Sequence, residues 1–180
     1  SIFCIILISN IKVGYQDYAK YRSDPSKEAS SQLSPYFHSG QISTHEVFDK
    51  ISELESWSPE SINPKMVGRR EGWWGSTENF ESFMDELITW RELGYHTCVR
   101  RANYNQYSSL PEWAIKTLHE HSSDEREHIY SLDELTYSQT HDEIWNAAQN
   151  QLRTKGVIQN YLRMLWGKKI LEWKPNAQID

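Results

Sequence analysis

A dense run of hydroxyl and amide side chains precedes Pro35 in this sequence. The run comprises Ser30, Ser31, Gln32, Leu33 and Ser34. Serine hydroxyls, together with the backbone N–H groups of a tight turn, can wrap a phosphate. An ordinary turn or helix N-cap uses the same residue types, and the residues alone favour that interpretation.

A second polar group recurs on a helix expected over residues 157–173. Asn160, Arg163, Met164 and Gly167 follow the i, i+3, i+4, i+7 spacing of one helix face. The opposite face is apolar and carries Ile158, Leu162, Leu165, Trp166 and Trp173. A helix buried on both faces must give its polar groups partners, and these are either a polar ligand or an ion pair for Arg163. Gly167 lowers helix propensity and therefore predicts a close approach of backbone or ligand.

Other possible chemistry finds less support. His119, His121 and His128 stand near Asp124 and Glu127, but their spacing matches no common metal-ligand pattern, so we expect a solvated segment and no metal site. The sequence contains no Gly-x-Ser-x-Gly, no P-loop and no Gly-x-Gly-x-x-Gly motif. Acyl transfer and mononucleotide-binding loops therefore receive no support.

Composition narrows the class of protein. The 180 residues carry 19 Lys and Arg against 25 Asp and Glu, for a net charge of −6, which excludes a histone-like nucleic-acid coat. No apolar run reaches the roughly 18 residues of a membrane span. Two cysteines, Cys4 and Cys98, cannot build a disulfide framework, which favours a reducing compartment. The 8 Trp and 10 Tyr against 5 Phe indicate an aromatic-rich core or rings that both stack and hydrogen-bond.

Helical periodicity positions these residues, and no useful strand pattern appears, so the expected class is all-α, a helical bundle. Ser43 and Thr140 are expected N-caps, and Gly156 is an expected helix stop. We expect helices over residues 13–22, 44–54, 77–101, 111–121, 133–137, 140–155 and 157–173, with irregular segments over 26–40 and 57–75.

The helix over 77–101 carries a candidate acid at its edge. Glu86 and Trp90 stand four residues apart and should lie together beside the buried stripe. That stripe is expected to comprise Phe80, Phe83, Met84, Leu87, Ile88, Arg91, Tyr95 and Cys98.

Four blocks of the sequence, in the family's order and spacing, resemble the flavin-binding helical domain of DNA photolyases and cryptochromes. They read YAKYRSDP from Tyr18 followed by SSQLSPYFHSGQIS from Ser30, ELITWREL from Glu86, THDEIWNAAQ from Thr140, and GVIQNYLRMLWGKKILEW from Gly156. The last two blocks are most similar to class II photolyases and related bacterial proteins. Ser39 departs from the family pattern, which commonly has an aromatic residue there, and the Trp90-Arg91 order is more typical of class I.

The resemblance implies that a folded FAD lies at the centre of an all-helical domain. It implies cofactor contacts at Tyr18, Ser30, Ser31, Gln32, Leu33, Ser34, Arg91, Asn160 and Arg163. It implies contacts to a damaged pyrimidine pair at Glu86, Trp90, Asn160 and Met164. In the family, an Asp beyond the aligned blocks pairs with the arginine matched by Arg163.

The implied activity is FAD-dependent, blue-light repair of cyclobutane pyrimidine dimers in DNA by electron transfer. Damaged DNA is the implied partner, with phosphate contacts or a merely solvated surface at Arg69-Arg70, Arg100-Arg101 and Lys168-Lys169. Trp166 and Trp173 either pack the core or lie on an electron route to the flavin. Two alternatives remain: a cryptochrome-like photoreceptor without repair activity, and a helical interaction module without cofactor.

The ends of the chain predict a fragment. We expect an apolar edge over residues 1–12, a partial FAD-binding domain over 13–175 and a truncated end over 176–180. Such a piece is expected to be a monomer, not attached to a membrane, cytoplasmic (or nuclear or organellar in a eukaryote), and unable to hold FAD tightly or act alone.

Overall fold

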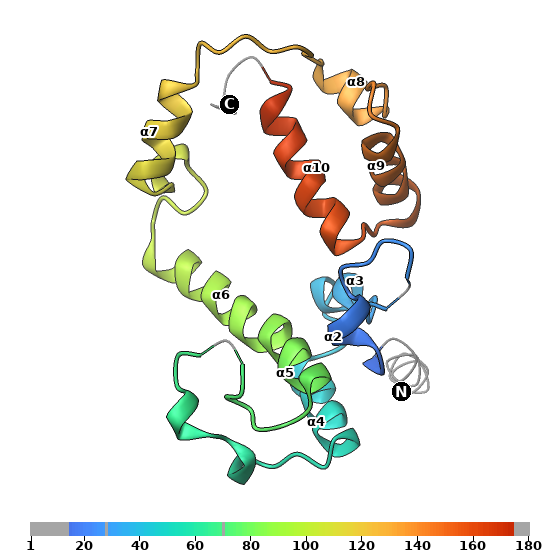
Figure 1. The fold of residues 1–180 in the computed structure, drawn as a ribbon, viewed down its shortest axis with the longest axis vertical. Helices are drawn as coiled ribbons and strands as arrows, with labels where there is room; N and C mark the ends of the chain where they lie inside the picture. Colours follow the sequence, from blue (N-terminus) through green and yellow to red (C-terminus); the bar gives the residue numbers. More distant parts are fainter. Residues whose placement is uncertain (1–14, 28, 70, 175–180) are drawn as a thin grey trace. The chain divides into compact units, whose positions relative to one another are not determined.

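A computed structural model describes residues 15–27, 29–69 and 71–174 of the chain, and every regular element in these ranges is helical (Figure 1). The all-α prediction is therefore confirmed for the described residues. The α-helices are α2 Tyr18–Tyr21, α3 Ser34–His38, α4 Thr44–Leu54, α5 Glu78–Met84, α6 Arg91–Arg100, α7 Glu112–Glu120, α8 Leu132–Thr136, α9 Glu143–Lys155 and α10 Asn160–Glu172. Between α5 and α6 lies a π-helical turn, η3 Asp85–Trp90. Short 3₁₀ turns cover Pro59–Ser61, Pro64–Met66 and Tyr107–Ser109.

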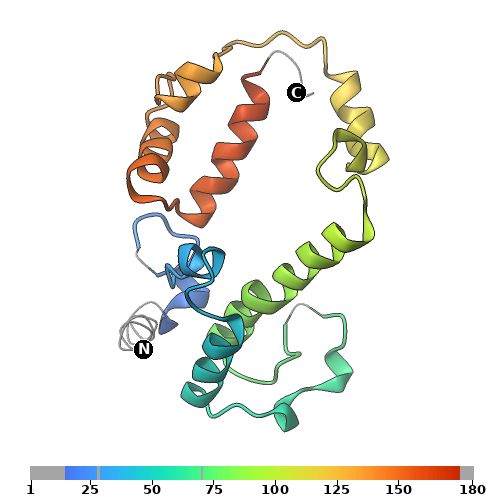
Figure 2. The same cartoon turned by 180° about the vertical axis from the view of Figure 1, so that it is seen from behind.

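The chain divides into two compact units, Ser1–Gly94 and Tyr95–Asp180. In the first unit α2 packs against α5, and a continuous apolar core forms around them. The most deeply buried members of this core are Leu33, Val47, Ile51, Phe80 and Met84. In the second unit α9 and α10 lie side by side (Figures 1 and 2) over a smaller core of Leu135, Trp145 and Trp173.

Several helix boundaries form where the sequence places capping residues. The Ser43 hydroxyl accepts the Glu46 backbone N–H at 3.0 Å, so α4 begins as predicted. Thr77 caps α5 in the same way through the Phe80 N–H at 3.3 Å. Gly156 ends α9 with a φ of +70°, a left-handed conformation that glycine adopts without a Cβ penalty.

Four predicted boundaries are corrected by the structure. α9 is capped by Asp142, whose carboxylate accepts the Trp145 N–H at 2.9 Å, while the Thr140 hydroxyl donates to Asn146 instead. α10 begins only at Asn160, because the Gln159 side chain accepts the first N–H groups and caps it there. The segment 26–40 is not wholly irregular, because Pro35 occupies the first turn of α3. In its described part the predicted helix over 13–22 is interrupted by a turn at residues 16–17, with Tyr15 helical before it and α2 after it, and residues 13–14 lie outside the described residues.

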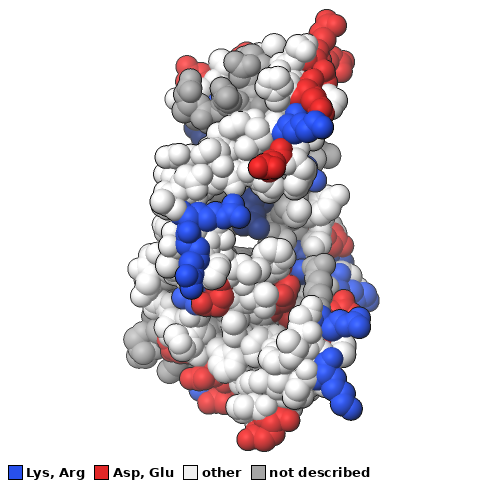
Figure 3. All heavy atoms as spheres, turned by 90° about the vertical axis from the view of Figure 1, so that its left-hand side faces the viewer, with Lys and Arg blue, Asp and Glu red and all other residues white. Residues whose placement is uncertain are grey.

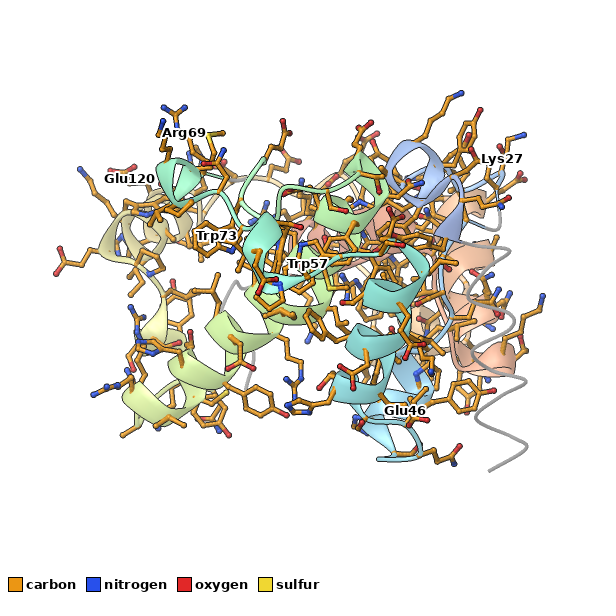
Figure 4. The ribbon with its side chains drawn as sticks, turned by 90° about the horizontal axis from the view of Figure 1, so that it is seen from below. Lys27, Glu46, Trp57, Arg69, Trp73 and Glu120 are labelled. Atoms are coloured by element: carbon orange, nitrogen blue, oxygen red, sulfur yellow. The ribbon has the colours of Figure 1, made fainter. Side chains whose placement is uncertain are left out.

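The long segment between α4 and α5 is irregular, as predicted, but hydrogen bonds and ring contacts hold it against α5. The indole of Trp57 stacks on Phe80 and donates through Nε1 to the Trp74 carbonyl at 2.7 Å. The carboxylate of Glu81, which is buried, accepts the backbone N–H of Gly72 at 3.1 Å and of Gly75 at 2.9 Å. Figure 4 labels Trp57 within this loop and Arg69 at its outer side. The loop is therefore an ordered part of the first unit.

The buried stripe predicted for residues 77–101 ends sooner than expected. Phe80, Phe83, Met84 and Leu87 are buried, whereas Arg91, Tyr95 and Cys98 are exposed. All ten residues of α6 are exposed, so no face of this helix continues the buried stripe beyond η3. None of the described helices is long and apolar enough to cross a bilayer.

Candidate functional site

Glu86 and Trp90 both belong to the π-helical turn η3, between α5 and α6. A π turn closes i to i+5 hydrogen bonds and is rare, and such turns frequently occur at functional sites. The carboxylate of Glu86 is half-buried, and 56% of Trp90 is exposed. The structure therefore places the predicted acid and the predicted ring on one unusual turn of the first unit.

Arg22, just after α2, forms an ion pair with Glu86 through Nη1 and Oε1. The Arg22 side chain is 18% exposed and that of Glu86 is 37% exposed, so the pair is partly shielded from water. The same guanidinium lies over the ring of Tyr18, 5.7 Å from its centroid. Burial raises the pKa of the Tyr18 phenol above its ordinary value, and the Arg22 charge opposes that rise. Arg22 thus links a predicted cofactor residue to a predicted substrate residue.

Arg22 is not among the predicted site residues, although it lies in the YAKYRSDP block. Its spacing of four residues from Tyr18 predicts a contact between these two side chains, because residues i and i+4 share a helix face. The pairing with Glu86, 64 positions further along the chain, has no sequence signature. Asp85 was missed as well: its Oδ2 accepts the indole N–H of Trp90 at 3.1 Å.

The hydroxyl-rich run before α3 is partly built into the core. The Leu33 side chain is only 1% exposed and joins the apolar core of the first unit. Gln32 has a φ of +52°, and Leu33 follows in the right-handed helical region. Ser30 and Ser34 are exposed on either side. The buried Leu33 therefore anchors a tight turn. Two successive residues of this turn, Gln32 and Leu33, have left-handed and right-handed backbone conformations.

The predicted residues of α10 lie in the second unit. Arg163 donates through Nη2 to Oδ1 of Asn160 at 2.7 Å, one turn away. Arg163, Met164 and Gly167 are exposed, so this face of α10 is not buried within the described residues. A Cβ added at Gly167 would meet no described atom within 4 Å, so the predicted close approach is not observed. The predicted site residues thus form two sets, one in each unit.

Three tryptophans form the centre of the second unit. The rings of Trp145 and Trp166 are nearly parallel, with centroids 6.4 Å apart, and Trp145 meets Trp173 edge-on at 5.5 Å. Both inner indoles have acceptors: Trp145 donates to the Trp166 carbonyl at 3.1 Å, and Trp166 donates to Gln149 at 2.8 Å. Trp145 is not among the tryptophans predicted to lie on an electron route. Its ring contacts place it between the two that are, Trp166 and Trp173.

The histidine-rich segment and the basic pairs have ordinary surroundings. His121 contacts Asp124 at 2.7 Å on the exposed surface, and the described residues contain no cluster of three or more His, Cys, Asp or Glu suited to a metal. Arg101 donates to the Ser109 carbonyl at 2.9 Å, whereas Arg69 is exposed and Arg70 lies outside the described residues. Lys and Arg side chains on the face in Figure 3 lie among acidic ones.

No family model matches this sequence. Curated relatives do match it. The chain is 40% identical over 156 residues to the deoxyribodipyrimidine photo-lyase of Methanothermobacter thermautotrophicus, 37% over 152 residues to that of Potorous tridactylus, and 36% over 159 residues to that of Oryza sativa subsp. japonica. These alignments cover 84–88% of this chain and 25–30% of the relatives.

The described residues form an all-helical fold, and the curated relatives that match the chain are named deoxyribodipyrimidine photo-lyase. The chain belongs to the photolyase family. It spans between a quarter and a third of the length of the curated relatives it matches.

Proposed function

We propose that the protein carrying this chain is a deoxyribodipyrimidine photo-lyase that repairs cyclobutane pyrimidine dimers in DNA with light and FAD. The observation that carries the proposal is the π turn, where a half-buried carboxylate and an exposed indole lie on one helical turn beside Arg22. A carboxylate and a flat ring are the groups needed to hydrogen-bond and to stack a base.

The turn before α3 supports the choice of cofactor. Successive N–H groups in left- and right-handed conformations form a small concave site that suits an anion. Gln32 and Leu33 have this arrangement, with the Ser30 and Ser34 hydroxyls exposed beside it. The Leu33 N–H donates to the Ser31 hydroxyl at 3.4 Å, so a bound diphosphate would take the place of that hydroxyl as its acceptor. The residues proposed to hold FAD are Tyr18, Ser30, Ser31, Gln32, Leu33, Ser34, Arg91, Asn160 and Arg163.

The chemistry divides between cofactor and chain. FAD, when bound, supplies the light-driven transfer of an electron. The chain binds and orients the damaged base, which must leave the duplex to reach a site inside the protein. The Glu86 carboxylate accepts a hydrogen bond from an N–H group of the base, and the Arg22 guanidinium fixes the orientation of that carboxylate. Trp90, Asn160 and Met164 are the other proposed base contacts.

The tryptophans of the second unit have a proposed second use. Trp166 and Trp173 are proposed to conduct electrons towards the flavin, with Trp145 between them at centroid distances of 6.4 and 5.5 Å. Packing alone would also bury these rings, so the Trp145→Phe variant separates the two roles. It keeps an aromatic ring in the core and should slow photoreduction of a bound flavin without loss of repair by flavin that has been reduced chemically.

The decisive experiment is repair of a dimer-containing oligonucleotide. The flavin-loaded protein that contains this chain should restore the intact pyrimidines under blue light and not in the dark. A coloured protein without repair would favour the cryptochrome-like photoreceptor, and a protein without flavin absorbance would favour the interaction module. Either outcome would contradict the proposed function.

A further inference from the structure

The π turn brings together two side chains that an α-helix would hold apart. Asp85 and Trp90 are five positions apart, and an α-helix turns by about 100° per residue, which would separate them by roughly 140° around the axis. In the wider π turn, residue i lies close to residue i+5. The indole Nε1–H of Trp90 thereby reaches Oδ2 of Asp85 at 3.1 Å.

An exposed tryptophan needs a restraint if its ring is to present a fixed face. Trp90 is 56% exposed, and its indole can rotate about two side-chain bonds. Asp85 has a short side chain attached to the helix backbone, it is only partly exposed, and it is close enough to Tyr18 to raise the pKa of that phenol. The hydrogen bond between them is itself exposed, and it restrains the indole plane by joining Nε1 of Trp90 to a short side chain on the helix backbone.

We propose that Asp85 is a positioning residue for Trp90, whose carboxylate holds the indole ready to stack against a base that has left the duplex. The hydrogen bond is independent of function, whereas the base as ligand rests on the function proposed above. Asp85 contacts neither the base nor the cofactor in this proposal and acts through Trp90 alone.

Charge offers a competing account that predicts the opposite result. A carboxylate near a DNA-binding surface repels phosphate, so its removal by itself should tighten binding to damaged and undamaged DNA alike. Under that account Asp85→Ala and Asp85→Asn are equivalent, because both remove the charge. Under the positioning account they differ, because asparagine keeps a side-chain carbonyl that can accept the indole N–H.

The first measurement uses this chain without cofactor or DNA. Selective ¹⁵N labelling of tryptophan gives one indole N–H signal per tryptophan, and the signal lost in Trp90→Phe identifies that of Trp90. Asp85→Ala should move this signal and speed its hydrogen exchange, Asp85→Asn should do so less, and the other indole signals should stay in place. An unmoved Trp90 signal in Asp85→Ala would overturn the proposal whatever the protein does.

The second measurement is dark binding of one oligonucleotide, with and without a pyrimidine dimer, to the flavin-loaded protein. Asp85→Ala should lower the preference for damaged DNA about three- to tenfold, as expected for one hydrogen bond, and Asp85→Asn should restore it to within about twofold. In a Trp90→Phe background Asp85→Ala should have no further effect. Equal effects of the two Asp85 variants would overturn the proposal in favour of charge. A wild-type protein without preference for damaged DNA would overturn the proposed function and the stacking role with it, even if the Trp90 signal responds to Asp85.

Discussion

The guanidinium of Arg22 pairs with the carboxylate of Glu86 although the two residues are 64 positions apart in the chain. The pair joins the end of α2 to the π turn, and the Arg22 guanidinium also covers the Tyr18 ring. The Arg22 guanidinium therefore connects Tyr18, a predicted cofactor contact, to Glu86, a predicted base contact, within the first unit. Its removal should affect both stability and function.

Arg22→Ala should lower the free energy of unfolding by about 1 kcal/mol, the upper end of the range for partly exposed ion pairs. A double-mutant cycle with Glu86→Gln, followed by urea unfolding, would isolate the interaction energy. The control is Lys50→Ala, which breaks the exposed pair between Lys50 and Glu53 and should leave stability unchanged. Additive effects of Arg22→Ala and Glu86→Gln would show that the pair contributes nothing.

Glu86→Ala should keep bound FAD but lower the yield of dimer repair by about tenfold or more, because the hydrogen bond between the Glu86 carboxylate and the damaged base is lost. The measurement is the quantum yield of repair per absorbed photon, at equal flavin content. Glu78→Ala removes an exposed acid from the first turn of α5 and serves as the control. An unchanged yield in Glu86→Ala would remove this residue from the site.

Glu81→Ala should destabilise the first unit by about 1–3 kcal/mol, because the backbone N–H groups of Gly72 and Gly75 lose their shared acceptor. Glu81→Gln should cost less, because its amide oxygen still accepts a hydrogen bond. Hydrogen exchange resolved by residue should show faster exchange in the loop 57–75 and little change in α9. Uniform loss of protection across the chain would instead argue against a local anchoring role.

Gly75→Ala and Gly68→Ala form a matched pair that separates backbone strain from steric overlap. Both glycines have positive φ, +64° and +75°, so alanine costs about 1–2 kcal/mol at either position. Only at Gly75 would the new Cβ also lie 2.0 Å from a backbone oxygen, that of Ser61, whereas Gly68 has open space. Thermal unfolding should show a clearly larger loss for Gly75→Ala. Equal losses would show that the loop moves freely to accommodate the methyl group.

Alkaline pH should destabilise the first unit through Tyr15. Burial, and then the hydrogen bond its hydroxyl donates to Glu55 at 2.8 Å, raise the pKa of this phenol above its ordinary value. Since the unfolded phenol releases its proton near pH 10 and the folded one does not, the stabilisation is present below about pH 10 and is lost above it. Tyr15→Phe should flatten the fall in stability above about pH 10, measured by urea unfolding. Tyr161→Phe, at an exposed position of α10, is the control.

Local signals in the sequence determined most of the helices and several of their ends. Ser43, Thr77 and Gly156 act within one turn of their own position, so their roles follow from residue type and spacing. The cap of α9 was misplaced, because Thr140 and Asp142 are both good capping residues and only the contact of Thr140 with Asn146 decides between them. The four blocks that resemble photolyases were likewise identified from residue type and order alone.

Contacts between distant residues were decided only by the tertiary structure. Residue spacing predicts neither the pairing of Arg22 with Glu86 nor the hydrogen bonds from the loop backbone to Glu81. Both depend on how α2, α5 and the loop pack around one core. The π turn is the clearest case. An α-helical repeat assigns Glu86 and Trp90 to one face, whereas the wider turn also pairs Trp90 with Asp85, since one additional residue per turn changes which side chains meet.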